Sequence, residues 1–340
     1  MAGSKIILTI FPFQVFMSNH LFRNALRKTN MKSMLLRAFA SCGLVLASTQ
    51  SGRAQVNITF DYTYDTHGFF SGANNIARTD LEAAASSLQS RLADSLSAIT
   101  PGGGNSWSST FMNPETGGQQ TVANSSIAAN TLVVYVGARN LSSSELALAG
   151  FGGFSAPGIQ PWLDTVSKRG QTGAPNTDFG PWGGSISFSS TVSWYFDPDP
   201  STVDVPAGQN DFYSVALHEL GHVLGIGGAT SWDKLITGSQ FTGAGAMALY
   251  GGPVPVTADH GHWADGMMST IPGTSTLQEP AMDPTITVGT RKYFTDLDFA
   301  GLSGIGWEVT PVPEPEQFAL VAGLGLLGFA VCRRRLGQRA

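Results

Sequence analysis

The fifteen residues from Phe212 to Ile226 read FYSVALHELGHVLGI, and they hold the strongest signal in the chain. Within this apolar stretch His218 and His222 are four residues apart. Residues i and i+4 lie on one face of a helix, about 6 Å apart, so two imidazoles can grip one tetrahedral ion. Glu219 lies about 100° around the helix, beside the coordination position that remains open. The stretch predicts a helix that carries part of a metal site.

The three polar residues of this helix match the chemistry of zinc hydrolysis. Zinc requires neutral imidazoles and lowers the pKa of bound water towards about 7, so that hydroxide becomes available at neutral pH. Glu219 is then the predicted general base, which accepts the proton of this zinc-bound water and delivers it to the leaving amine. A helix with ordinary surface histidines would have no need of an acid between them.

The sequence that follows resembles the metzincin metalloproteases, whose motif is HExxHxxGxxH with a later methionine turn beneath the metal. Gly225 matches the motif glycine, but position 228 is Gly where the family has a ligand. Metzincins of the leishmanolysin type place an insertion before the third histidine, and a His-Trp dipeptide occurs there. The resemblance implies His262, in Asp259-His260-Gly261-His262-Trp263, as the third ligand. His260, Asp259 or no third protein ligand are the alternatives.

The resemblance also implies a methionine turn. Met282, in Pro280-Ala281-Met282-Asp283-Pro284, fits it better than Met267 or Met268, because a proline and a predicted helix with a Thr295/Asp298 cap follow. The tyrosine that some metzincins carry after this methionine is absent, since Asp283 and Pro284 stand there. Transition-state stabilisation would then depend on the metal and on backbone donors.

The implied fold and activity follow from the same family. We expect an α+β domain with a metzincin-like twisted mixed sheet, the active-site helix and a smaller C-terminal subdomain. The implied activity is that of a secreted zinc-dependent endopeptidase acting on proteins or peptides, with the strand Ile186–Phe196 pairing with the extended substrate. The rival is a non-catalytic cell-surface or matrix protein that keeps the fold. Gly228 favours this rival, whereas the intact Glu219 argues against it.

Periodicity predicts the remaining elements. Strands are expected at residues 56–64, 132–136 and 186–196, and a long loop at 151–183. A helix is expected from Leu81 to Ile99, with a Thr79/Glu82 capping box, and a final helix around residues 297–302.

Charge and cysteine usage exclude several classes of protein. Residues 55–310 hold 8 of the 19 Lys and Arg and 22 of the 24 Asp and Glu, a net charge of −14 that disfavours nucleic acid. Both cysteines, Cys42 and Cys332, lie outside this range, which excludes a cysteine-ligated metal there. Asp197, Asp199 and Asp204 could hold calcium, although a solvated acidic loop is the simpler interpretation. His67 is expected at the surface.

The N-terminal residues predict export. From Met31 the chain has a basic start (Lys32, Arg37), an apolar run from Ala38 to Ala47 and a small-residue site at 52–54, as a secretory signal peptide does. Residues 31–54 are therefore the predicted signal, and residues 55–310 the protease domain. Residues 1–30 do not fit this pattern, because their apolar run precedes their basic cluster. They are interpreted as a non-native N-terminal extension.

The C-terminal residues 311–340 resemble the PEP-CTERM sorting signal of Gram-negative bacteria. Pro313-Glu314-Pro315 precedes an apolar run, Phe318–Cys332, and three arginines, 333–335. Fifteen residues of helix span roughly 22 Å, short of a bilayer core of roughly 30 Å, so the run predicts transient transmembrane anchoring. The resemblance implies processing by an exosortase-like enzyme after export across the inner membrane, and delivery to the cell surface or the extracellular matrix.

Overall fold

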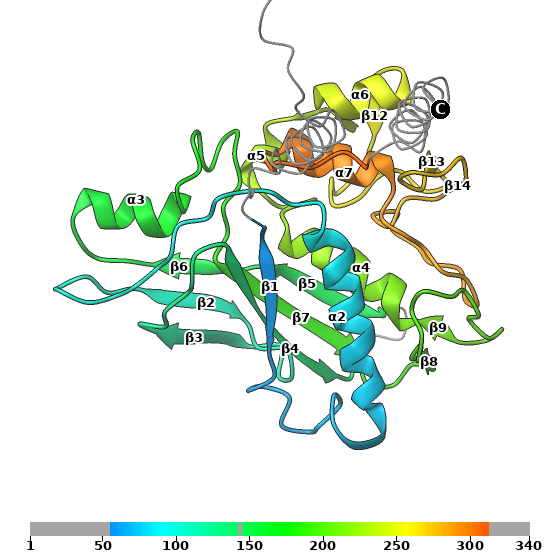
Figure 1. The fold of residues 1–340 in the computed structure, drawn as a ribbon, viewed down its shortest axis with the longest axis horizontal. Helices are drawn as coiled ribbons and strands as arrows, with labels where there is room; N and C mark the ends of the chain where they lie inside the picture. The colour runs from blue at the N-terminus through cyan, green and yellow to red at the C-terminus, as the bar shows by residue number, and fades with distance from the viewer. Residues whose placement is uncertain (1–54, 142–144, 313–340) are drawn as a thin grey trace, which may run out of the picture. The chain divides into compact units, whose positions relative to one another are not determined.

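A computed structural model describes residues 55–141 and 145–312, and all of them belong to one compact unit. Helices and strands both contribute to it, so the predicted α+β class is confirmed (Figure 1). No helix in the described ranges is long and apolar enough to cross a membrane. The predicted signal at 31–54 and the run Phe318–Cys332 lie outside these ranges, and both stay predictions.

The central sheet has four strands in the order β1-β4-β7-β5, namely Asn57–Asp61, Thr131–Arg139, Gly183–Ser189 and Ala147–Phe151. The first three run parallel, and β5 pairs antiparallel with β7, so the sheet is mixed. The predicted strands at 56–64 and 132–136 correspond to β1 and β4. No strand is expected from the sequence at β5, whose small residues carry little β signal.

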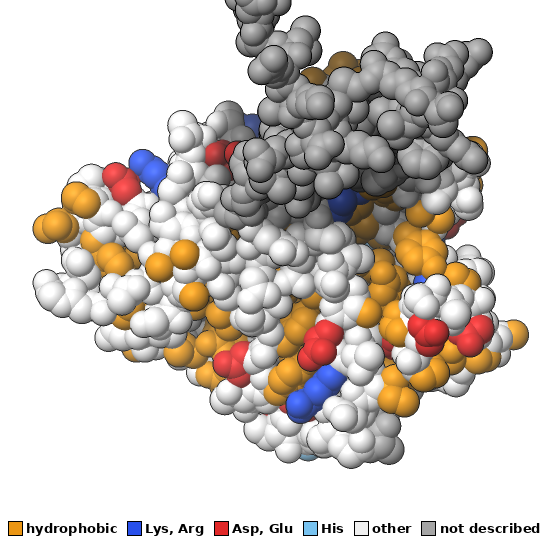
Figure 2. All heavy atoms as spheres, in the orientation of Figure 1, with side chains coloured by type: hydrophobic (Ala, Val, Ile, Leu, Met, Phe, Trp, Pro, Cys, Tyr) orange, Lys and Arg blue, Asp and Glu red, His pale blue; other side chains and the backbone are white. Residues whose placement is uncertain are grey.

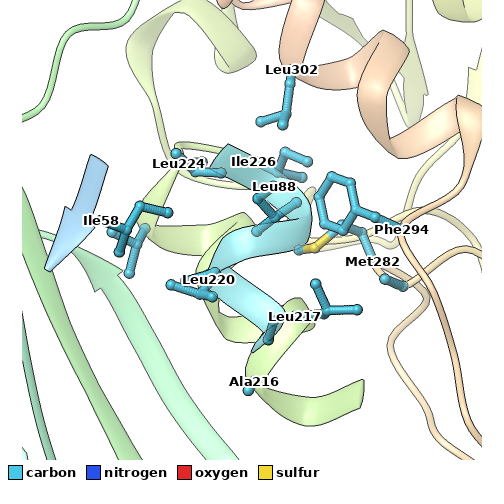
Figure 3. Close-up of a cluster of buried hydrophobic side chains, with 14 of the residues drawn as sticks. Ile58, Leu88, Ala216, Leu217, Leu220, Leu224, Ile226, Met282, Phe294 and Leu302 are labelled. Carbon is cyan, nitrogen blue, oxygen red and sulfur yellow. The ribbon is translucent and has the colours of Figure 1, made fainter. Parts of the chain in front are cut away.

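Two helices that are distant in sequence pack together beside this sheet (Figure 1): α2, Ile76–Gln89, and α4, Phe212–Val223. Helix α4 also contacts β5. Leu88 of α2 and Leu217 and Leu220 of α4 enter the main hydrophobic core, which Figure 3 shows. Burial of this apolar face against α2 and the sheet fixes the position of the predicted metal helix.

The predicted helix Leu81–Ile99 is wrong at both ends. Helix α2 starts at Ile76, so Thr79 lies inside it and no Thr79/Glu82 capping box forms. The helix ends at Gln89, and the chain continues extended, with bridges from Leu92 to Val309 and from Ile99 to Ile127. Leu92, Leu96 and Ile99 are buried in this extended segment. Their spacing in the sequence happens to match that of a helix, which explains the wrong prediction.

The predicted loop at 151–183 contains a strand and a helix. Strand β6, Gly153–Ser155, extends a small sheet with β2, Ser108–Met112, and β3, Gln119–Ala123. Helix α3, Gln160–Lys168, buries only Trp162 and Val166, one turn apart. Two apolar residues are too few to give a readable periodicity.

The predicted strand Ile186–Phe196 is two strands. Strand β7 ends at Ser189, and after a bend Trp194–Tyr195 forms β8, which pairs with β9, Asn210–Asp211. Every residue of β7 is buried, including its serines, and β4 and β5 pair with its two edges. The proposed substrate pairing of this strand is therefore wrong, since it has no free edge.

The chain after α4 consists of short elements. In chain order they are α5 (Thr230–Asp233), β10 (Ile236–Thr237), β11 (Gln240–Phe241), α6 (Ala244–Tyr250), β12 (Val254–Pro255), β13 (Ser269–Thr270), β14 (Leu277–Gln278) and α7 (Asp296–Gly304). The earlier 3-10 turn η1 covers Gly72–Asn75. Trp232, Trp263 and Leu302 join the same core as α4, so this C-terminal part shares the core of the sheet. The predicted Thr295/Asp298 capping box of α7 is present.

Candidate metal centre

The helix that carries His218 and His222 begins and ends where the sequence expects. Asp211 caps α4 by accepting a hydrogen bond from the Ser214 N–H. Gly225, with φ of +103°, turns the chain at its end in a conformation that other residues resist. Both histidines are partly buried, and their Nε2 atoms are 3.1 Å apart.

The structure brings His262 to these two residues. Its Nε2 lies 3.2 Å from the Nε2 of His218 and 3.2 Å from that of His222. Nitrogens bound tetrahedrally at 2.0–2.1 Å would be about 3.3 Å apart, so the observed triangle has the size that zinc requires. In the described residues this triad is the one group of three or more His, Cys, Asp or Glu side chains that could hold a metal ion.

Hydrogen bonds and burial set the protonation of the triad. His218 Nδ1 donates to the Ala281 carbonyl at 2.7 Å, and His222 Nδ1 donates to the Ile226 carbonyl at 3.0 Å. Each Nε2 is thereby left with a lone pair that points at the centre of the triad. Burial lowers the pKa of His222 to about 4 and lowers the pKa values of His218 and His262 as well. Converging neutral nitrogens suit a cation.

The loop that delivers His262 is held by its own hydrogen bonds. Two hydrogen bonds link Thr257 and His262. The Thr257 N–H donates to the His262 carbonyl at 3.0 Å, and the His262 N–H donates to Thr257 Oγ1 at 3.1 Å. His260 lies at the tip with φ of +63°, and its carbonyl accepts the Trp232 indole N–H. Neither His260 nor Asp259 joins the triad.

Two glycines allow the loops to approach α4. A Cβ on Gly227 would lie 2.2 Å from the Gly261 carbonyl oxygen, directly beside His262. A Cβ on Gly221 would lie 2.2 Å from the sulfur of Met282. Met282 is fully buried against α4, with Phe294 beside it (Figure 3). The predicted methionine therefore packs under the metal helix, while Met268 is exposed and Met267 lies elsewhere in the core.

Asp298 links the loops on the other side. Its buried carboxylate accepts hydrogen bonds from the Trp263 indole and from the N–H groups of Ala281, Met282 and Thr295, besides the Thr295 hydroxyl. One side chain thus fixes the residue after His262 and the turn that contains Met282. The sequence indicated Asp298 only as a helix cap.

Glu219 faces the same cavity as the histidines. The cavity has a volume of about 550 Å³, and Glu219, the triad and residues 145–149 line it together with Ser214, Asp283 and Lys292. Burial raises the pKa of Glu219 to about 8. A divalent cation at the histidines would lower this pKa again, because an adjacent positive charge favours the carboxylate.

Lys292 forms a charged wall of this cavity that sequence reasoning missed. Its ammonium lies 2.8 Å from Glu279 and 3.2 Å from Asp283, and it donates to the Thr285 carbonyl at 2.6 Å. Asp283 and Pro284 also line the cavity. A basic residue in a loop without a recognised motif carries no sequence signal for such a position.

The open edge of β5 runs along the cavity. Ser189 N–H donates to the Leu146 carbonyl and Gly152 N–H to the Gly183 carbonyl, both at 2.8 Å. Hydrogen bonding alternates along an antiparallel strand, so the backbone groups of Ala147, Ala149 and Phe151 point away from β7. No strand of the described ranges pairs with that side of β5. This edge, rather than residues 186–196, can accept an extended peptide.

The other candidate residues do not form a site. Asp197 is buried and pairs with Arg291 at 2.8 Å, and Asp211 pairs with the same guanidinium at 2.7 Å. Asp199 accepts from Ser201, and Asp204 accepts from Tyr195, so the three predicted calcium ligands do not converge. His67 is largely exposed, as expected, and contacts Glu115.

No protein-family model, no curated protein and no solved structure matches this chain.

Proposed function

We propose that this protein is a zinc-dependent endopeptidase whose metal ligands are His218, His222 and His262. The observation that carries the proposal is the convergence of three neutral imidazole nitrogens, 3.1–3.2 Å apart, on a cavity that Glu219 also lines. A metal kept only for structure needs neither a carboxylate beside it nor an open cavity. The non-catalytic alternative rested on Gly228, and His262 removes the need for a ligand at that position.

Zinc held by His218, His222 and His262 would supply an electrophile for the scissile carbonyl and an acidified water. Glu219 is the group of this chain that can hold and move a proton. It is placed to accept the proton of the attacking water and to pass it to the leaving amine nitrogen. The carbonyl bonds of His218 and His222 keep their rings in the tautomer that binds metal.

The substrate would bind along the free edge of β5. Ala147, Ala149 and Phe151 each offer an N–H and a C=O, so an extended peptide can add a strand to the sheet. Antiparallel addition is favoured, because an antiparallel pair is slightly more stable than a parallel pair. Only an extended chain makes these bonds, which indicates flexible proteins and peptides as substrates.

The test compares Glu219→Ala with wild-type protein. Zinc content, measured by atomic emission, should be unchanged, whereas the rate of casein or gelatin cleavage should fall by about 10² or more, as for loss of a general base. Glu219→Gln is the matched variant of equal size. Full cleavage by zinc-loaded Glu219→Ala protein would eliminate the proposed mechanism.

We also propose that the protein is exported and sorted to the cell surface. This proposal is supported by the sequence pattern of residues 31–54 and 311–340 alone.

A further inference from the structure

A second cavity lies where β5 ends. It has a volume of about 190 Å³, and its walls are residues 151–154, 174–175 and 179–182, part of α3 and Thr230. None of the lining residues is charged, and the polar side chains among them are the hydroxyls of Ser167 and Thr230. Pockets for drug-sized ligands measure about 300–1,000 Å³, so this one has room for a side chain rather than a small molecule.

Aromatic rings form the walls of this cavity. Phe151 is 36% exposed and Phe154 is 42% exposed. The Phe151 ring packs edge-on against the Phe179 ring, with the ring centroids 4.9 Å apart. A Cβ on Gly152 would lie 2.0 Å from the Trp182 ring, so glycine allows the strand to rest on the indole. Hydrophobic side chains are also exposed over α3, β2 and β6 on the face shown in Figure 2.

The two cavities lie along the same strand, because residues 147–149 of β5 line the first and Phe151 lines the second. Phe151 is the last of the three residues whose backbone groups point to the open edge of β5. A Cβ on Gly228 would lie 3.4 Å from the Phe151 ring, and Gly227 touches Gly261 next to His262. Gly227 and Gly228 therefore lie between the loop that carries His262 and the Phe151 ring.

The direction of a bound peptide follows from the strand. Residues 145–149 line the first cavity together with α4 residues from Ser214 to His222, whereas Phe151 lies beside Gly228, after the end of α4. A peptide antiparallel to β5 would therefore present its N-terminal residues to Phe151 and its C-terminal residues to Ser214. At about 3.3 Å per residue, Phe151 is about 7 Å beyond Ala149.

We propose that the second cavity binds a large apolar side chain, preferably aromatic, that stands two to four residues before the cleaved bond of the substrate. This inference rests on the proposed endopeptidase function. An uncharged cavity with aromatic walls gains most from a buried ring and penalises a charge. The edge of β5 holds the backbone, and the cavity selects the side chain.

The experiment uses extended peptides with Phe, Ala or Asp at one position at a time before the cleaved bond. Their cleavage by zinc-loaded wild-type protein gives kcat/KM, and their binding to zinc-loaded Glu219→Ala protein is measured by fluorescence anisotropy. At one position, two to four residues before the bond, Phe should exceed Ala by about tenfold in both measurements, as expected for one buried ring. Asp there should fall below Ala.

Two variants test whether the cavity causes this preference. Thr230→Trp should fill it, and Phe154→Ala should remove an exposed wall without disturbing the core. Both should bring the Phe-to-Ala ratio to about two or less, since the ring loses its contacts. Thr274→Trp is the matched control, in the exposed turn between β13 and β14, and should leave the ratio unchanged.

The outcomes separate this inference from the proposed function. Cleavage without a Phe preference, or with one that both variants retain, overturns the cavity assignment and leaves the peptidase intact. A preference located after the cleaved bond and lost in the variants overturns the direction. If nothing is cleaved but Glu219→Ala protein still prefers the Phe peptide through the cavity, the peptidase proposal fails and the binding site stands. Absence of both cleavage and binding overturns both.

Discussion

The histidine triad is supplied by two regions of different kinds: helix α4, and the loop from Val256 to Trp263. In α4, His218 and His222 are four residues apart in sequence, and the local helical geometry alone brings them to the same face. In the loop, His262 is placed by a strand-like bridge between Val256 and Trp263 and by contacts with residues far away in sequence. The histidines meet within 3.2 Å all the same.

The loop is more sensitive to single substitutions than the helix. The helix depends on hydrogen bonds between neighbours and on burial against α2, so few single changes move its histidines. The loop depends on a small number of long-range contacts, chiefly the Trp263–Asp298 hydrogen bond at 2.9 Å and the close approach at Gly227. Changes in the loop and its anchors should therefore affect metal binding first.

The largest expected effect distinguishes the two histidines of the loop. His262→Ala should lower zinc affinity by about 10³-fold or more, because it removes one of the three proposed ligands. His260→Ala should change the affinity less than about threefold, since its side chain lies outside the triad. Competition with a fluorescent chelator measures both. The reverse ranking would move the third ligand to His260 and refute the described geometry.

The next effect concerns the anchor of the loop. Asp298→Asn keeps the size of the side chain but replaces one acceptor oxygen by an NH2 group. This group cannot accept the hydrogen bonds that the wild-type carboxylate accepts. We expect the free energy of unfolding to fall by about 3 kcal/mol and zinc affinity to fall by about 10–100-fold. Urea unfolding of the metal-free protein and chelator competition measure the two quantities. Thr295→Ser, which keeps the helix-cap hydroxyl, is the mild control. Unchanged zinc affinity in Asp298→Asn would mean that the loop holds His262 without this anchor.

The smallest effect tests the helix side of the comparison. Asp80 of α2 is fully buried, and its carboxylate accepts the Asp197 N–H at 2.7 Å. Burial, together with the carboxylates of Asp197 and Asp211, raises the pKa of Asp80 from 3.8 to about 7. The folded protein therefore holds this proton more tightly than the unfolded chain does. Its contribution to stability is full below about pH 4 and is lost as the pH rises to about 7.

Asp80→Asn should remove this pH dependence. Between pH 5 and pH 8 the wild-type protein should lose about 2 kcal/mol of unfolding free energy that the variant retains, while zinc affinity at fixed pH stays the same. Denaturant titrations at the two pH values measure the difference. A variant as pH-dependent as the wild type would show that Asp80 is already ionised in the folded protein.

Particular residues show how far sequence reasoning reaches. The metal helix was predicted within a few residues, because its apolar face, the histidine spacing and the turn at Gly225 are all local signals. The Thr295/Asp298 cap was predicted for the same reason. Helix α2 was extended wrongly to Ile99, because residues buried by an extended segment happened to continue the helical spacing. Strand β5, which offers the free edge, has no local signal in its alanines and glycine.

By itself the sequence determined the helix with its two histidines and Glu219, and the acidic, thiol-free character of residues 55–310. It also proposed His262 and Met282, though only through a resemblance. The tertiary structure alone decided that His262 rather than His260 meets the helix, that Asp298 ties that loop to the Met282 turn, and that β5 rather than residues 186–196 has an open edge. The physical reason is the range of the interactions: helical spacing and caps act between residues three or four apart, whereas ligand convergence and strand order depend on burial and hydrogen bonds between segments that meet only when the core forms.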